Sequence, residues 1–323
     1  AMKIIIDCDM GIDDAIAVAY ALALQDVDVL GIGSVHGNIE ADVAAENTLK
    51  LLKVMNRTDI PVAVGAPKPM IRPLSMAKFV HGEDGLGNAN FAPSGLVPSD
   101  EHAADQIIRL ARENPGEITL ITTGPLTNAA IALLKEPKLP QLIPHVVVMG
   151  GTVEHPGNVG PVSEANIAHD PEAAQIVFSA PWKVTMVGLD VTMKTLLLEQ
   201  HLDAWKQART PLTEWLLRIV PFYMQFYSQS LGYMACAMHD ALAVGIAVGK
   251  VEVSESMTCP VWVNTAVGPG LGQTVADRRS ENMRATSEPY YFIGESNTEV
   301  IMKVDGDAFV SHLVDSIASY QVR

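Results

Sequence analysis

Short apolar segments alternate with amphipathic segments along the first 190 or so residues, and this alternation restricts the possible folds. The apolar runs span 3–9, 27–38, 117–124, 145–151 and 182–192, and helix-like segments follow the first four at 13–24, 40–55, 125–135 and 170–178. The runs are rich in Val and Ile and lack a period of two, which is typical of parallel strands covered on both faces. Strands that alternate with helices predict an α/β fold with a Rossmann-like core: a doubly wound, mostly parallel sheet with helices on both faces.

The remaining segments predict different structure. Residues 61–98 are rich in Pro and Gly and include "HGEDGLGNANF", so we expect a mobile loop near the sheet. Beyond about residue 200 the pattern becomes helical; residues 258–293 read as short strands, and 307–320 as a last helix. Without a repeat or a linker, the chain is expected to form one domain over residues 1–323.

Composition narrows the classes of partner. The chain has 323 residues, 22 Lys and Arg against 37 Asp and Glu, and a formal net charge of −15. Such a surface repels nucleic acids and anionic lipids, so we expect neither as a partner. Three cysteines without paired spacing, and no secretion leader or membrane-length apolar run, predict a reduced, cytoplasmic protein.

Acidic side chains crowd behind the first apolar run. Asp7, Asp9, Asp13 and Asp14 all fall within "DCDMGIDD". A helix N-cap explains one or two of them, but four close carboxylates raise one another's pKa unless a cation compensates. Cys–His and His–His pairs are missing nearby, and oxygen ligands favour Ca²⁺ or Mg²⁺ over zinc. Because Ca²⁺ takes about six to eight oxygens, other segments must contribute, and Asp240 in "MHDALAVGIAVG" is a candidate.

Polar residues also follow the other apolar runs. They include His36 to Asn38, Thr122 and Thr123, and Asn158 to Asn166. The carboxyl ends of parallel strands meet at one edge of a doubly wound sheet, which is where ligands bind. The sequence therefore predicts a polar site at that edge.

Seven motifs in order resemble those of the inosine–uridine-preferring nucleoside hydrolases. They are "DCDMGIDDAIA" from Asp7, "HGN" at 36–38, "HGEDGLG" at 81–87, "TTGPLTN" at 122–128, "VVVMGG" at 146–151, "GNVGPVSEANIAHDPEAA" at 157–174 and "MHD" at 238–240. The resemblance covers essentially the whole chain. Two positions depart from the family pattern: Met10 replaces a usual Pro, and Ala165 stands where an aromatic residue is common. The loss of that ring is expected to loosen the pocket wall without removing a ligand.

The resemblance implies a nucleoside substrate, a bound Ca²⁺ and a homodimer or homotetramer. The reaction would be hydrolysis of the N-glycosidic bond to base and ribose, with inversion. The implied roles are as follows: Ca²⁺ ligands Asp9, Asp14, the Thr123 carbonyl and Asp240; ribose contacts Asp13, Asn38, Asn158, Glu164 and Asn166; Asp9 as general base and His239 as proton donor; base-side residues His81, Tyr223 and Tyr227; and Asp7 orienting the others.

Two alternative functions are weighed against this one. A haloacid-dehalogenase-like Mg²⁺-dependent phosphatase also has D-x-D after its first strand, but Gly11 occupies the place of its Thr or Val. The acidic surface also disfavours phosphorylated substrates. A ribose- or nucleoside-binding protein without catalysis would need neither Asp9 as a base nor His239 as an acid.

Overall fold

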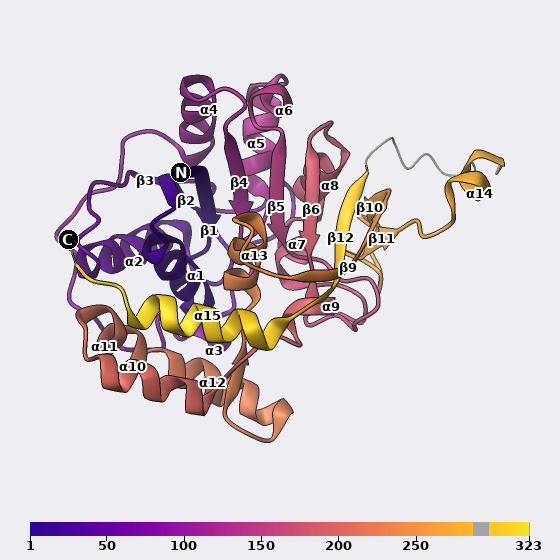
Figure 1. Ribbon diagram of the computed structural model, residues 1–323. Coiled ribbons are helices and arrows are strands. Elements are labelled where there is room, and N and C mark those ends of the chain that lie inside the picture. Colours follow the sequence, from indigo (N-terminus) through magenta and orange to yellow (C-terminus); the bar gives the residue numbers. More distant parts are fainter. Residues whose placement is uncertain (287–296, 323) are drawn as a thin grey trace.

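A mostly parallel sheet forms the centre of the computed structural model, which describes residues 1–286 and 297–322 (Figure 1). Within those residues its eight strands follow the order β3-β2-β1-β4-β5-β6-β12-β9, and only β9 runs antiparallel to its neighbour. The strands are β1 Met2–Cys8, β2 Val27–Ser34, β3 Val62–Val64, β4 Ile118–Thr122, β5 His145–Met149, β6 Lys183–Val187, β9 Val253–Cys259 and β12 Thr298–Val304. The predicted doubly wound α/β fold is confirmed.

Helices cover both faces of this sheet. One face packs against α1 (Ile12–Ala23), α2 (Ala41–Val54), α13 (His239–Ala247) and α15 (Gly306–Ala318), and the other against α4 (Ala103–Glu113), α5 (Thr127–Lys135) and α8 (Pro171–Ser179). In β1, Ile4 and Ile6 join the first apolar layer and Ile5 the second. The unbroken isoleucine run is therefore explained by burial on both sides.

The strand order places a topological switch point between β1 and β4. From β1 the sheet continues through β2 and β3 in one direction and through β4, β5 and β6 in the other. Loops that leave β1 and β4 at their carboxyl ends must diverge, and the crevice between them is the usual ligand site of such sheets. Asp9 follows β1 and Thr123 follows β4, so the predicted polar edge lies at this crevice.

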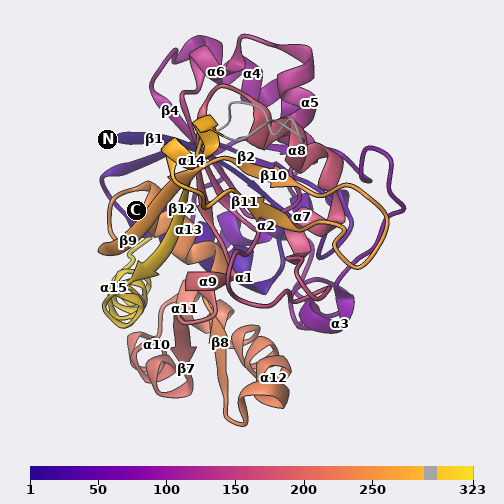
Figure 2. The ribbon, with the colours of Figure 1, turned by 90° about the vertical axis from the view of Figure 1, so that its right-hand side faces the viewer.

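A second group of elements lies at one end of the molecule in both ribbon views (Figure 2). It comprises the two-stranded sheet of β7 (Leu196–Leu198) and β8 (Ala235–Ala237) together with α10 (Leu202–Ala208), α11 (Pro211–Leu217) and α12 (Val220–Leu231). β8 leads directly into α13, and α12 contacts both β8 and the short helix α3 (Lys78–His81). This connection brings the tyrosines of α12 to the start of α13.

Four local expectations were wrong or incomplete. The stretch 61–98, expected as a loop, contains β3 and α3, and the apolar "VAV" of β3 forms one edge of the main sheet. Residues 281–286 form helix α14 (Glu281–Thr286) instead of a strand, whereas 287–293 lie outside the described residues. Strand β12 was not expected. The apolar run 182–192 divides into β6 and a helical turn, α9 (Leu189–Thr192).

Two further observations concern the cysteines and the length of the apolar helices. All three cysteines are free and buried. Among residues 1–286 and 297–322, no helix has the length and apolar character needed to cross a membrane.

A buried amide holds the carboxyl ends of β1 and β2 together, and this yields a first prediction. Asn128 Nδ2 donates to Asp7 Oδ1 and to the Ser34 carbonyl at 2.8 Å each, and Asn128 Oδ1 accepts from Ala66 N–H. Asn128→Ala would leave three buried groups unpaired and should lower the free energy of unfolding by about 2 kcal/mol or more. Urea unfolding followed by circular dichroism measures the loss.

Asn282→Ala on the exposed face of α14 is the matched control and should change little. Equal stability of the two variants would contradict a structural role for the Asn128 contacts.

Candidate active site

The acidic cluster lies at the junction of β1 and α1. Asp9 follows the strand, Asp13 and Asp14 occupy the first turn of α1, and all three are buried. Asp14 Oδ1 accepts from the Gly11 N–H at 3.0 Å, so one acid does serve the helix terminus. Gly11 permits close packing, because a Cβ there would lie 2.6 Å from His81 Nδ1 and 2.8 Å from Asn38 Nδ2.

Segments distant in sequence complete this cluster. The main-chain N–H of Asn38 donates to Asp9 Oδ2 at 2.9 Å, and its side-chain amide donates to Asp14 Oδ1 at 3.0 Å. The Thr123 hydroxyl donates to Asp14 Oδ2 at 2.8 Å. Asp240, in the first turn of α13, donates its main-chain N–H to Asp13 Oδ2 at 3.2 Å. Four strand-to-helix connections therefore supply one site.

No basic side chain of the described residues forms an ion pair with this cluster. Burial, and secondarily the Asp14 carboxylate, raise the pKa of Asp9 and of Asp13 well above the ordinary value. Burial and repulsion by Asp13 act in the same direction on the pKa of Asp240. None of the ion pairs in the described part of the chain includes these acids. Asp9 Oδ1 and Asp13 Oδ1 are buried without a hydrogen-bond partner.

The acidic side chains of the described residues do not make a complete metal site by themselves. Within residues 1–286 and 297–322, no three His, Cys, Asp or Glu side chains form a set that could hold a metal ion by themselves. Repulsion from the neighbouring carboxylates raises the pKa of Asp9 and of Asp240. A metal site that also uses a main-chain carbonyl, water and substrate hydroxyls needs no complete side-chain set.

Three of the predicted ribose contacts lie around the start of α7 (Ala165–His169). Glu164 caps this helix: its oxygens accept from the main-chain N–H groups of Gly151, Asn166 and Ile167 at 2.9 to 3.1 Å. Asn166 Nδ2 donates to the Thr123 carbonyl at 3.0 Å. Asn158 is exposed, and its Oδ1 accepts from Ala165 N–H at 2.9 Å. The Thr123 contact ties this group to the acidic cluster.

Aromatic residues and histidines adjoin the acids on the other side. Tyr227 hydroxyl and His239 Nε2 are 2.6 Å apart, and His239 Nδ1 lies 2.7 Å from the Thr192 hydroxyl. The His81 ring stacks on Tyr223 with centroids 5.2 Å apart, and His81 Nδ1 accepts from Ile12 N–H at 3.0 Å. His81, in the stretch expected to be a mobile loop, is thus buried and anchored.

Both buried histidines are held neutral. Burial, and secondarily His155, lower the pKa of His239 to about 4, and burial and then His239 lower the pKa of His81 to about 3. The pKa of His239 therefore lies well below the near-neutral value of a free imidazole. A neutral imidazole still offers one donor and one acceptor, so it can relay or orient a proton.

Asp7 lies beside the cluster but contacts different residues. It belongs to the face of β1 that carries Ile5, where Oδ1 accepts from Asn128 and Oδ2 is buried without a partner. Burial raises its pKa to about 7, although the Asn128 hydrogen bond lowers it. The expected role of Asp7 in orienting the other acids stays a prediction.

Sequence reasoning missed the contribution of α9. Asp190 accepts hydrogen bonds from the main-chain N–H groups of Val153, Glu154 and His155, and Thr192 contacts His239. The signal was present as two polar residues in "GLDVT" after an apolar strand, but the whole run was interpreted as one strand.

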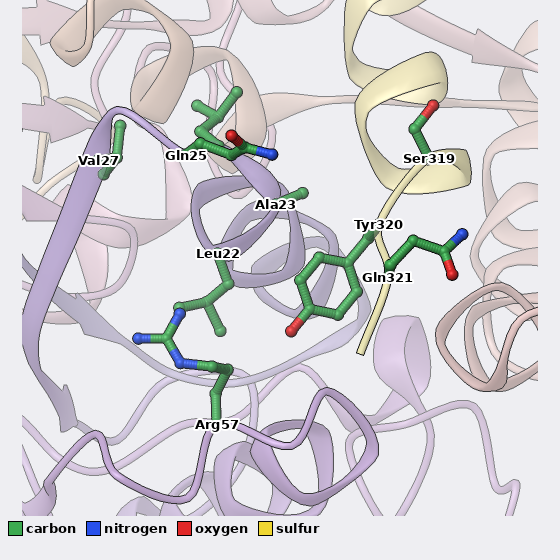
Figure 3. Close-up of a pocket in the computed structure, with 9 residues that line it drawn as sticks. Leu22, Ala23, Gln25, Val27, Arg57, Ser319, Tyr320 and Gln321 are labelled. Atoms are coloured by element: carbon green, nitrogen blue, oxygen red, sulfur yellow. The ribbon is translucent and has the colours of Figure 1, made fainter. Parts of the chain in front are cut away.

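A surface cleft of about 400 Å³ lies elsewhere, and it is lined by Arg57, Tyr320 and the residues around the C-terminal end of α1 (Figure 3). The acids lie at the N-terminal end of that 12-residue helix, about 18 Å away at 1.5 Å per residue. This cleft is separate from the candidate site.

Glu164 gives a prediction about pH and stability. Burial raises its pKa to about 7, so the folded protein keeps a proton that the unfolded chain releases above about pH 4.3. The stability that this bound proton contributes is complete below that pH and is lost as the pH rises towards 7. Over that range the free energy of unfolding falls by at most about 1.4 kcal/mol per pH unit. Between about pH 5 and about pH 8, the melting temperature of Glu164→Gln should therefore fall less than that of the wild type.

Glu252→Gln, an exposed carboxyl, is the matched control and should follow the wild type. Parallel pH profiles for all three proteins would contradict the assignment to Glu164.

Comparisons with known proteins agree on one family. Residues 4–311 match the family described as inosine-uridine preferring nucleoside hydrolase. The pyrimidine-specific ribonucleoside hydrolase RihA of Salmonella newport is 35% identical over 323 residues, which cover 99% of each chain. Probable uridine nucleosidase 2 of Arabidopsis thaliana is 39% identical over 244 residues, covering 75% of this chain and 76% of that protein.

Solved structures support the same assignment. The plant nucleoside hydrolase PpNRh1 superimposes with a TM-score of 0.93 at 32% identity, covering 98% of this chain and 99% of that one. A purine-preferring ribonucleoside hydrolase from Gardnerella vaginalis has a TM-score of 0.88 at 30% identity and covers 98% of both chains. The fold, its polar edge and these similarities lead to one conclusion: the chain belongs to the inosine-uridine preferring nucleoside hydrolase family and is a ribonucleoside hydrolase.

Proposed function

We propose that the acidic cluster binds Ca²⁺ and that the site hydrolyses the N-glycosidic bond of nucleosides, with Asp9 as general base and inversion at the anomeric carbon. The observation that carries this proposal is the burial of Asp9, Asp13, Asp14 and Asp240 together without a basic partner. A binding protein without catalysis would need neither Asp9 as a base nor His239 as an acid. Gly11 and the family assignment oppose a haloacid-dehalogenase-like phosphatase.

The residues fit a calcium ion by their chemistry. Asp9 Oδ1 is buried and unpaired, Asp14 and Asp240 add carboxylates, and the Thr123 carbonyl adds a neutral oxygen. Such a mixed oxygen set suits a hard cation that accepts about six to eight ligands, the remainder being a water and two ribose hydroxyls. When bound, Ca²⁺ supplies a fixed positive charge that lowers the pKa of a water ligand and orients the sugar.

The two oxygens of Asp9 would allow it to serve both as a ligand and as the general base. Oδ1, which has no partner among the described residues, would bind the ion, and Oδ2, held by the Asn38 N–H, would accept the proton of a water beside it. If a water beside Asp9 attacks the anomeric carbon directly, no covalent enzyme intermediate forms, and the configuration at that carbon is inverted.

The remaining acids and amides serve the sugar. Asp13 keeps Oδ1 unpaired, and Asn38, Asn158, Glu164 and Asn166 surround the same edge. Negative charge in a water-poor site stabilises the positive charge that develops on the ribose in an oxocarbenium-like transition state. Asp7 supports this edge from the opposite face of β1 through Asn128.

His239, Tyr227, Tyr223 and His81 form the leaving-group side. His239 and Tyr227 hydrogen-bond directly, so a proton for the departing base comes from this pair. The stacked pair of His81 and Tyr223 offers an aromatic wall for the base. RihA of Salmonella newport is named pyrimidine-specific and the Gardnerella enzyme purine-preferring; we propose that the aromatic wall tolerates both classes of base here.

The first test concerns Asp9. Asp9→Ala should lower the rate of ribose release from inosine and uridine by about a hundredfold or more, because the water loses its proton acceptor and Ca²⁺ a ligand. A reducing-sugar assay measures the rate, and circular dichroism verifies the fold. Asp28→Ala, on strand β2, is the control. An Asp9 variant with the wild-type rate would refute the role of base.

The second test concerns the ion. Chelator-treated protein should lose activity. Ca²⁺ should restore it and, at one hundred times its Kd, raise the free energy of unfolding by about 2.7 kcal/mol, which a higher melting temperature reports. The raised pKa of Asp9 and Asp240 means that protons compete with the ion, so the increase should be larger at about pH 8 than at about pH 5. Full activity after exhaustive chelation, with the ion absent by elemental analysis, would contradict a calcium-dependent site.

A further inference from the structure

We infer that Thr127 is a positioning residue: its hydroxyl joins His36 to Asp170 and thereby holds together two segments that support the candidate calcium site. This inference rests on the proposed function and deepens its metal-binding step. Thr127 lies in the motif "TTGPLTN", whose resemblance to the family implies a role for Thr123 but none for Thr127. It acts on the site only through the segments that it joins.

The hydroxyl of Thr127 connects side chains that are far apart in the sequence. Thr127 begins α5 and is buried. Its oxygen lies 2.8 Å from His36 Nε2, and its hydrogen is donated to Asp170 Oδ2 at 2.6 Å. His36 and Asp170 are completely buried as well. Buried groups have no solvent to replace a lost partner, so this chain of contacts is costly to break.

His36 carries the connection to Asp9. The next residue, Gly37, has no side chain to hold the loop, and a Cβ there would collide with Asp9 Oδ2. Asn38 follows, and its main-chain N–H donates to that same oxygen. Within residues 1–286 and 297–322, Thr127 is the only hydrogen-bond partner of the His36 ring. The contact of His36 with Thr127 therefore anchors residues 36–38 outside the acidic cluster.

Asp170 carries the connection to the Thr123 carbonyl. It lies between α7 and α8, and its Oδ1 caps α8 by accepting from the Ala173 N–H at 3.1 Å. Helix α7 contains Asn166, whose Nδ2 donates to the Thr123 carbonyl at 3.0 Å. The hydrogen bond from Thr127 to Asp170 thus ties α7, together with its contact to that carbonyl, to the start of α5.

The two segments support different candidate ligands of the ion. Residues 36–38 hold Asp9, and α7 holds the Thr123 carbonyl. Calcium contacts its oxygens at about 2.3 to 2.6 Å, so it binds tightly only where its ligands keep their separation. Groups that orient metal ligands from outside typically contribute about tenfold to a hundredfold in affinity or activity. Because Thr127 bonds to both segments, it helps to fix the separation of these two ligands.

Calcium affinity tests this role. Thr127→Val replaces the hydroxyl by a methyl group of similar size and removes one partner from His36 and one from Asp170. It should raise the Kd of Ca²⁺ by about tenfold to a hundredfold. Calorimetric titration of chelator-treated protein measures the Kd. Thr127→Ser, which keeps the hydroxyl, should restore a Kd close to that of the wild type.

Hydrogen exchange tests the same contacts without the ion and without turnover. The Asn38 N–H donates to Asp9 Oδ2 at 2.9 Å, which protects this amide from exchange. In chelator-treated Thr127→Val the Asn38 amide should exchange about tenfold faster than in the chelator-treated wild type, because its loop opens more readily. Nuclear magnetic resonance measures the exchange rate.

Thr185→Val is the matched control. Thr185 is buried, and its hydroxyl lies 2.8 Å from His145 Nε2 and 3.5 Å from Glu299 Oε1. It therefore forms the same kind of group, a threonine between a histidine and a carboxylate, but on strand β6. Thr185→Val should leave the Kd of Ca²⁺ and the exchange of the Asn38 amide at the wild-type values.

Each outcome bears on the proposal. A Thr127→Val variant with the wild-type Kd and wild-type exchange at Asn38 would overturn it, and so would equal changes in Thr185→Val. If valine prevents folding, Thr127→Ala, which only removes atoms, is measured instead; failure of both variants to fold would overturn a role specific to the site. Wild-type protein that binds no Ca²⁺ would refute the proposed function, and the exchange measurement would still test Thr127.

Discussion

The structure depends on one electrostatic constraint, the burial of several carboxylates that no basic side chain within residues 1–286 and 297–322 neutralises. Asp9, Asp13, Asp14 and Asp240 lie together, and burial raises the pKa of each. A cluster of this kind costs stability in the protein alone. In the proposed mechanism the same repulsion would provide affinity for a cation and an electrostatic field suited to a positively charged sugar.

The sheet makes this concentration of charge possible. Asp9 and Thr123 leave adjacent strands at the switch point, and α13 brings Asp240 from more than two hundred residues away along the chain. The residues proposed for the leaving group come from α3, α12 and the first position of α13. In the proposed mechanism, acids that serve the sugar would thus adjoin aromatic groups and imidazoles that serve the base.

Much of this arrangement could be predicted from the sequence, because local patterns determined it. Unbroken apolar runs specified the parallel strands, and the crowding of acids after "KIII" indicated a cation site. The missing parts depend on tertiary contacts: α9 is hidden within an apolar run, and the anchoring of His81 by the Ile12 N–H has no local signal. The pKa of His239 was likewise beyond the sequence, since burial lowers it.

A crystal structure grown with Ca²⁺ and a non-hydrolysable ribonucleoside analogue tests the central claim most directly. Our account predicts one ion in contact with Asp9, Asp14, the Thr123 carbonyl and Asp240, with the 2′- and 3′-hydroxyl groups completing its coordination. A ribose bound away from these acids, or an occupied site without the ion, would contradict it.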